Sequence, residues 1–141
     1  MSTRLFSFRM QDSTYERLAE QARLSGESKS ALAQRLIEEG LRVERHPGVV
    51  FRDGPTGRRA ALRRGPDVWE MIPALRSALS GEDTAIQEAA ERTGLTPKEV
   101  RVAIGYYAEF PAEIDERIRS NDALAERLEA EWLRARQIPV G

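Results

Sequence analysis

The sequence predicts a mainly α protein with short β segments, and three patterns predict it. Residues 5–10, LFSFRM, alternate in character so that one face of a strand over 3–10 would be wholly apolar. Residues 13–24 and 29–43 carry apolar side chains at helical spacing. Farther along, a turn-rich segment between two short apolar stretches indicates a β-hairpin, and helical periodicity follows it.

Two helices should follow the N-terminal strand. Ser13 and Glu16 have the spacing of a capping box, which places the start of the first helix at residue 13. Gly26 is suited to end this helix, because a glycine readily adopts the left-handed conformation found there. Ser28 is suited to cap the second helix, whose buried stripe would include Leu32.

The middle of the chain should hold a hairpin and three helices. Residues 49–51 and 60–62 flank the sequence DGPTG, which is typical of a hairpin tip. The next helix contains Pro73, which predicts a kink or a break within it. Two further helices are expected over 82–93 and 96–110, and Pro111 should end the second of them.

The chain from residue 112 onward should form a charged helix with a break at Ser120-Asn121-Asp122. After that break, Leu124, Leu128 and Trp132 are spaced four residues apart and form an apolar stripe. Two interpretations of the stripe are open. It could dock on the core of its own chain, or it could bind a groove of a partner with Trp132 as the anchor.

Composition narrows the class of protein. The 141 residues include no cysteine, which excludes disulfides and thiolate metal sites and fits the cytoplasm. No apolar run approaches the roughly 20 residues of a membrane-spanning helix, so we expect no membrane partner. His46 is the one histidine, and it precedes Pro-Gly as a turn residue would. No arrangement typical of catalysis is present, so we expect no enzyme, no metal site and no cofactor.

Charge is distributed unevenly along the chain. Residues 1–45 hold 8 Lys and Arg against 7 Asp and Glu, and residues 46–66 hold 5 against 1. Residues 67–141 hold 9 against 15, which makes the C-terminal half acidic. A polyanion such as DNA should therefore be bound by the N-terminal half.

The N-terminal strand has no second strand near it in sequence, and this points to a dimer. A strand and two helices, about 45 residues, bury too little surface to be stable alone. Two copies that pair their strands antiparallel would satisfy the edge hydrogen bonds and cover a four-helix core with Phe6, Phe8 and Met10. This order of elements over residues 3–43 resembles the ribbon-helix-helix family of bacterial repressors and antitoxins, of the CopG and Arc type.

The ribbon-helix-helix resemblance implies two sets of DNA contacts. The paired ribbon of such proteins enters the major groove, and the side chains that would read bases here are Leu5, Ser7 and Arg9. The start of the second helix anchors to DNA phosphate, and the residues at that place here are Ser28, Lys29 and Ser30. Leu5 departs from the family pattern, in which many members have a polar residue.

A second pattern lies in the acidic half of the chain. Ala90, Gly94 and Val100 have the spacing of a helix-turn-helix. A small core is expected there from Trp69, Leu75, Ile86, Ile104 and Tyr107. Lys98 and Arg101 would be exposed on its second helix, but the net acidic charge favours a scaffold over a DNA-reading helix.

The segments HPGVVFRDGPTGRRAAL, PDVWEMI and LTPKEVRVAIGYYAEFP resemble a second family, over about residues 46–114. It is a small bacterial helix-turn-helix-type domain that often serves as an antitoxin beside a PIN-like ribonuclease toxin. The basic cluster Arg58, Arg59, Arg63 and Arg64 could be solvated surface, a DNA backbone contact or a clamp on the acidic toxin. The candidate toxin-binding residues are Arg58, Arg59, Leu128 and Trp132.

Three regions are thus expected: a ribbon-helix-helix domain for DNA binding and dimerisation over 1–45, a hairpin and helix-turn-helix-like domain over 46–114, and a C-terminal helical tail over 115–141. The preferred hypothesis is a cytoplasmic bacterial antitoxin that binds double-stranded operator DNA on the nucleoid as a homodimer or higher oligomer. It would repress its own operon and neutralise a PIN-like ribonuclease toxin. The alternative is a stand-alone ribbon-helix-helix regulator whose C-terminal region senses a ligand or oligomerises.

Overall fold

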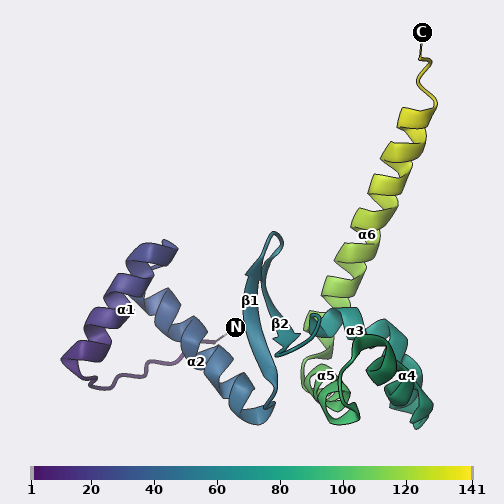
Figure 1. The fold of residues 1–141 in the computed structure, drawn as a ribbon. Helices are drawn as coiled ribbons and strands as arrows, with labels where there is room; N and C mark the ends of the chain where they lie inside the picture. The colour runs from purple at the N-terminus through teal and green to yellow at the C-terminus, as the bar shows by residue number, and fades with distance from the viewer. Residues whose placement is uncertain (1, 141) are drawn as a thin grey trace. The chain divides into compact units, whose positions relative to one another are not determined.

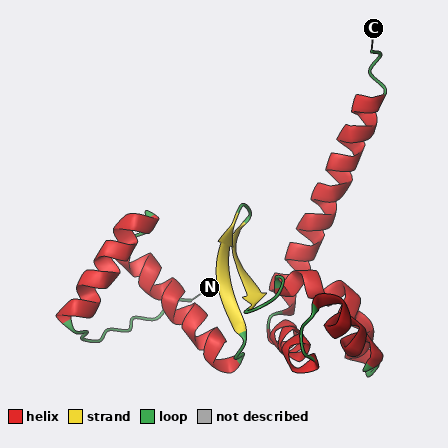
Figure 2. Cartoon of the chain, viewed as in Figure 1, coloured by secondary structure: helices red, strands yellow, loops and turns green. Residues whose placement is uncertain are grey.

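The computed structural model describes residues 2–140, and the described chain divides into two compact units, one ending at Arg42 and the other beginning at Val43. The described chain is mainly helical with one two-stranded antiparallel sheet, as the sequence predicts (Figures 1 and 2). No helix among the described residues is both long enough and apolar enough to cross a membrane.

The first unit contains α1 (Asp12–Ser25) and most of α2 (Lys29–Arg45), close to the predicted bounds. Gly26 ends α1 at a φ of 73°, and the Ser28 hydroxyl caps α2 by accepting a 3.1 Å hydrogen bond from the Ala31 N–H. The capping box predicted at Ser13 and Glu16 is wrong. The helix begins one residue earlier, so Ser13 lies within the first turn, and the N-cap residue Gln11 makes no side-chain cap bond.

Residues 2–11 have no regular secondary structure in the single chain, so the strand predicted over 3–10 is not formed there. A β-strand needs a second strand to accept and donate its backbone hydrogen bonds, and the first unit contains none. The Phe6 and Phe8 rings lie 5.7 Å apart between centroids. Residues two apart share a face in an extended chain, and the alternation that would place both rings on one face of a strand stays a prediction.

The second unit begins with a hairpin. Strands β1 (Val49–Gly54) and β2 (Gly57–Leu62) pair antiparallel, with Val49 opposite Leu62 and Gly54 opposite Gly57. A two-residue loop joins them, and Gly57 follows it at a φ of 102°, a conformation that favours glycine. The Arg117 guanidinium holds the tip of this hairpin, donating to the Thr56 hydroxyl at 2.6 Å and to the Thr56 carbonyl at 3.2 Å.

Helices complete the second unit (Figure 1): α3 (Val68–Leu75), the 3₁₀ helix η1 (Arg76–Ser80), α4 (Thr84–Thr93), α5 (Pro97–Glu109) and α6 (Pro111–Arg136). Pro73 lies inside α3, and the chain changes to 3₁₀ winding at Arg76, three residues after it. The break predicted at Ser120-Asn121-Asp122 is wrong, because α6 runs through these residues. Serine, asparagine and aspartate each cost a helix only about 0.5 kcal/mol relative to alanine. The good helix formers on either side offset this cost.

The core of the second unit lies between the hairpin and the helices. Its largest fully buried side chains are Val49, Leu62, Val68, Ile72, Leu75, Val100 and Tyr106. Leu75 and Ile86 are buried as predicted, whereas Trp69, Ile104 and Tyr107 are only partly buried. Val100, Ala103 and Tyr106 set the buried face of α5, so Ile104 and Tyr107 turn to its edge.

Candidate nucleic-acid interface and protein-binding surfaces

The predicted base-reading residues lie on a fully exposed segment. Ser7 and Arg9 are exposed, and Leu5 has 93% of its surface accessible. The Arg9 guanidinium makes no hydrogen bond or ion pair with any described residue, so no such contact would compete with DNA. The segment therefore leaves these side chains available to a ligand.

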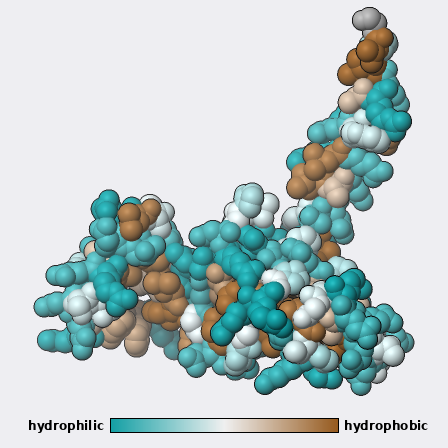
Figure 3. Space-filling model, in the orientation of Figure 1, coloured by the Kyte–Doolittle hydropathy of each residue, from teal (hydrophilic) through white to brown (hydrophobic). Residues whose placement is uncertain are grey.

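The first unit exposes far more apolar surface than it buries. Among its described hydrophobic residues, only Ala22 and Leu32 are buried. The exposed large apolar side chains are Leu5, Phe6, Phe8, Tyr15, Leu24, Leu36, Ile37 and Leu41. Figure 3 shows apolar surface gathered on this unit. Exposed apolar side chains in such number are typical of a surface that contacts another protein.

One face of α2 carries much of this exposed apolar surface. Ala33, Leu36, Ile37, Gly40 and Leu41 follow the spacing of a single helical stripe. A Cβ added at Gly40 would meet nothing within 4 Å, so no contact in the single chain accounts for this mid-helix glycine. Glycine in a helix interior costs about 1 kcal/mol relative to alanine, and close approach of a second helix would explain its presence.

The start of α2 presents the predicted phosphate-binding residues. Ser28, Lys29 and Ser30 are all exposed. The Ser28 oxygen accepts the cap bond, and the Lys29 ammonium lies 5.2 Å from the centre of the Tyr15 ring. The first backbone N–H groups of a helix have no acceptor within the helix, and the helix dipole favours an anion beside them. This end of α2 is thus electrostatically suited to phosphate.

Arg58 and Arg59, the two arginines of the basic cluster that the sequence proposes for toxin binding, are engaged within their own chain. Arg58 lies 3.4 Å from the Asp53 carboxylate across the hairpin. Arg59 forms an ion pair with Asp67, and the Trp69 indole N–H donates to the same carboxylate at 3.1 Å. Asp67 is only 6% exposed. Arg59 therefore serves the fold of the second unit and is a poor candidate for the toxin contact that the sequence suggests.

Gly54 makes the position of Arg59 possible. A Cβ at residue 54 would overlap the Arg59 guanidinium, so only glycine allows that group to lie over the end of β1. The spacing Arg-x7-Asp-x-Trp could have indicated the ion pair, but nothing in the sequence distinguishes it from an exposed pair. The sequence alone therefore does not identify Asp67 as a buried ion-pair partner.

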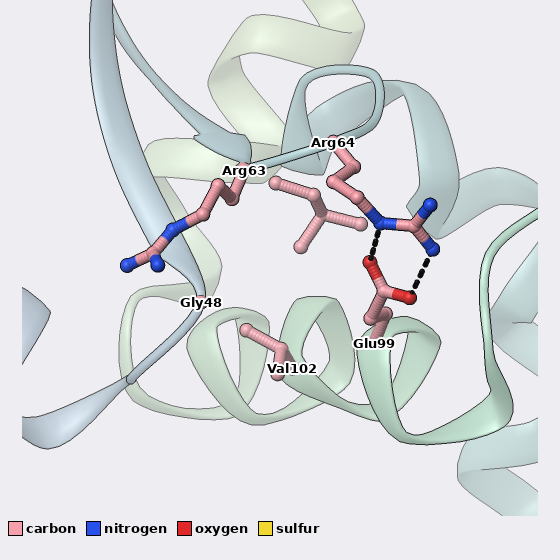
Figure 4. A pocket seen from close by; sticks show the side chains of 6 residues that line it. Gly48, Arg63, Arg64, Glu99 and Val102 are labelled. Atoms are coloured by element: carbon pink, nitrogen blue, oxygen red, sulfur yellow. Dashed lines mark hydrogen bonds and ion pairs between the residues drawn. The ribbon is translucent and has the colours of Figure 1, made fainter.

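Arg63 and Arg64 flank a hollow of about 240 Å³, and they differ in their contacts (Figure 4). Arg64 donates to both oxygens of Glu99 at 3.0 and 2.6 Å. Arg63 makes no ion pair with any residue that the structure describes, and its guanidinium points away from Glu99 (Figure 4). Gly48, Leu62 and Val102 also line the hollow. The hollow thus combines apolar walls with one unpaired cation.

The Arg64–Glu99 pair gives a testable pH dependence. Hydrogen bonds from Arg64, and then from the Thr96 backbone, lower the pKa of Glu99 to about 2. A carboxylate whose pKa is lowered on folding stabilises the fold at pH values above the ordinary carboxyl pKa. This stabilisation is lost as the pH falls toward 2. We expect the Glu99 carboxyl ¹³C signal to titrate near pH 2, and at a higher pH in Arg64→Ala, where the Thr96 hydrogen bonds to Glu99 remain. An ordinary midpoint in the unaltered protein would contradict the pairing.

The helix-turn-helix pattern corresponds to α4 and α5. Gly94 joins them at a φ of 74°, and Thr96 and Glu99 form a capping box at the start of α5. Lys98 and Arg101 are exposed on α5 as expected. His46 is not a free turn residue, because its Nε2 lies 3.2 Å from the Glu109 carboxylate and its ring packs against Tyr106. No group of three or more metal-ligating side chains occurs in the described part of the chain.

The distal part of α6 presents the remaining toxin-binding candidates. All residues from Arg119 to Val140 are exposed, including Leu128 and Trp132, which are 54% and 58% accessible. The interpretation that the stripe docks on the core of its own chain is therefore wrong. Figure 3 shows apolar patches along this helix. The Arg136 guanidinium lies 4.6 Å from the centre of the Trp132 ring.

Comparisons with models of protein families, with curated proteins and with solved structures found no match to this chain.

Proposed function

We propose that the protein is a sequence-specific DNA-binding repressor whose N-terminal unit dimerises as a ribbon-helix-helix. The observation that carries the proposal is the exposed apolar surface of that unit, described above. Pairing two copies of residues 3–10 would give each extended segment the hydrogen-bonding partner that it lacks. The same pairing would bury Phe6 and Phe8, which the single chain leaves exposed.

The chemistry of the opposite ribbon face supports DNA as the ligand. In a strand over residues 3–10, Ser7 and Arg9 lie on the face opposite Phe6 and Phe8. An arginine can donate two hydrogen bonds to guanine, a serine can donate or accept, and Leu5 can contact a thymine methyl. Phosphate bound at the start of α2, by Ser28, Lys29 and Ser30, would hold the ribbon in the groove.

Replacing Arg9 by alanine tests the reading face. Loss of a bidentate base contact costs about 1–3 kcal/mol per site. We expect the operator dissociation constant of Arg9→Ala to rise by at least about 10-fold in a gel-shift titration. Binding to unrelated DNA should change less, because Arg9 contributes there only as one charge.

Arg9→Lys is the matched control for charge. It keeps the cation but lacks the fork that bonds two guanine acceptors, so it should lose specificity while retaining non-specific affinity. Unchanged operator preference in both variants would refute the assignment of the ribbon. The DNA is taken from the region upstream of the coding sequence, where an autoregulating repressor binds.

An antitoxin role is the second candidate function, and the hollow beside Arg63 favours it. The resemblance of residues 46–114 to antitoxin domains suggests a PIN-like ribonuclease, whose metal site gathers carboxylates. An unpaired arginine beside apolar walls could hold such a carboxylate with two hydrogen bonds. Arg58 and Arg59 are already engaged, so Arg63 replaces them as the arginine that we assign to the toxin.

Co-expression with the product of the adjacent gene tests this role. We expect the two proteins to purify together, and Arg63→Glu to reduce recovery of the partner by at least about 10-fold through charge repulsion. Arg101→Glu, which reverses an exposed charge on α5, serves as the control. Recovery of this protein alone, with operator binding that changes on addition of a small molecule, would favour the stand-alone regulator instead.

A further inference from the structure

The buried face of α6 continues past the core without cover. Ile114 and Ile118 are buried against the second unit, at 3% and 8% exposure. From them, alternating steps of four and three residues lead to Asn121, Ala125, Leu128, Trp132 and Ala135. Such alternation is the spacing of a seam between two helices that pack along their length. All five of these later residues are exposed.

Charged residues flank the exposed seam in a pattern that selects the partner. Asp122, Glu129 and Arg136 lie along one edge of it, and Glu131 lies along the other. In two parallel helices, a residue on one edge meets the residue five positions later on the partner's facing edge. Glu131 of each copy then meets Arg136 of the other, so the attraction occurs twice.

The antiparallel arrangement lacks this match. When the seam from Ala125 to Leu128 is aligned with itself in the opposite direction, Asp122 of one helix lies beside Glu129 of the other. Like charges at such positions are destabilising. Glu131 and Arg136 lie on opposite edges of the seam, so they can meet across the pair only in the parallel arrangement, and this match favours it.

We infer that residues 121–136 of α6 pair in parallel and in register with the same residues of a second copy. The inference rests on the proposed N-terminal dimer, because a helix pair of this length is marginal by itself. Tethering through the dimer would raise the effective concentration of the two helices to about the millimolar range. A parallel helix pair has a two-fold axis along the helices. A single two-fold axis can therefore relate both the paired helices and the paired N-terminal segments.

Trp132 and Arg136 are arranged for this pairing. The indole supplies the largest apolar side chain of the seam, and Arg136 already lies over its ring. The guanidinium is thus held at the edge of the seam, where the Glu131 carboxylate of the second copy would arrive. An apolar groove of a toxin would have no need of this edge charge, so we assign the surface to a second copy.

Cysteine cross-linking of the full chain tests the inference, since the natural sequence has no cysteine. Ala135→Cys places a thiol at the seam. This thiol lies within disulfide reach of the same thiol in the second copy only in the parallel arrangement. Ala130→Cys places a thiol on the opposite face of the same exposed helix and is the matched control. We expect the disulfide-linked dimer of Ala135→Cys to form at least about 10-fold faster than that of Ala130→Cys.

Charge reversal adds a second measurement. Within the Ala135→Cys background, Glu131→Arg should slow cross-linking, and the further change Arg136→Glu should restore it. Equal rates for Ala135→Cys and Ala130→Cys in a protein that sediments as a dimer would overturn the inference and leave the proposed function intact. A protein that sediments as a monomer would instead refute the proposed dimer. Cross-linking of Ala135→Cys to a co-expressed toxin rather than to itself would also overturn the inference.

Discussion

Replacing Phe8 by aspartate is expected to convert the proposed dimer to a monomer and to abolish its proposed operator binding. Phe8 is 59% exposed in the single chain, and pairing of the two ribbons would bury it. Burying a phenylalanine side chain contributes about 1.5–3 kcal/mol, and each dimer contains two. A carboxylate at the same place would add a desolvation cost in both copies.

The size of the effect follows from these two contributions. We expect the dimer dissociation constant to rise by at least about 1,000-fold, which corresponds to about 4 kcal/mol. Sedimentation equilibrium measures the dissociation constant directly, and a gel shift measures the loss of operator binding. A Phe8→Asp protein that remains dimeric at micromolar concentration would contradict the ribbon pairing.

Ser7→Asp is the control for Phe8→Asp because it introduces the same charge on the opposite ribbon face. This variant should remain a dimer, since residue 7 does not face the shared core. It should nevertheless lose DNA affinity, because the new carboxylates would approach the phosphates of the groove. The pair of variants thus separates dimerisation from DNA contact.

The second large effect is expected at Asp67. In Asp67→Ala, the Arg59 guanidinium stays mostly covered but loses the carboxylate that balances its charge. Breaking a buried ion pair by removing one partner costs about 3–5 kcal/mol. We expect the free energy of unfolding of the second unit to fall by about 3 kcal/mol, the lower figure, since Arg59 is partly accessible.

Urea unfolding followed by tryptophan fluorescence measures this loss, because Trp69 and Trp132 both lie in the second unit. The double variant Arg59→Met, Asp67→Ala should recover part of the stability by removing the unbalanced charge. Arg63→Ala, which removes an arginine without a partner in the described chain, should leave stability unchanged. A similar loss in Arg63→Ala would refute the special role of the buried pair.

Local signals predicted most of the secondary structure. The hairpin, α4 and α5 are found where turn residues and caps placed them, because these signals act through neighbouring residues. The errors arise where contacts between residues far apart in the sequence, or sums of small energies, determine the structure. Burial of Tyr106 in place of Tyr107 depends on how α5 meets the core, and continuity of α6 depends on a sum of small propensities.

The candidate sites were predicted unevenly for a related reason. Leu5, Ser7 and Arg9 are exposed, as are Phe6 and Phe8, so both the division of this segment into two faces and its contact with DNA stay predictions. The sequence could show a basic cluster but not the pairing of its members. Asp67, which engages Arg59, lies just before α3, and Glu99, which engages Arg64, lies in α5, so both pairs depend on how the helices meet the hairpin. Arg63 could be singled out only once those partners were placed.

The hydrogen bonds at the base of α6 determine the direction in which its apolar face points. Arg117 joins the helix to the hairpin tip, while Tyr106 and Tyr107 donate to Glu113 and Asp115 at 2.7 and 2.8 Å. These bonds prevent rotation of the helix about its own axis, so Leu128 and Trp132 lie on a face of fixed direction relative to the core of the second unit. The surface is therefore oriented before a partner binds. Binding then costs less conformational entropy than it would if the helix could rotate freely.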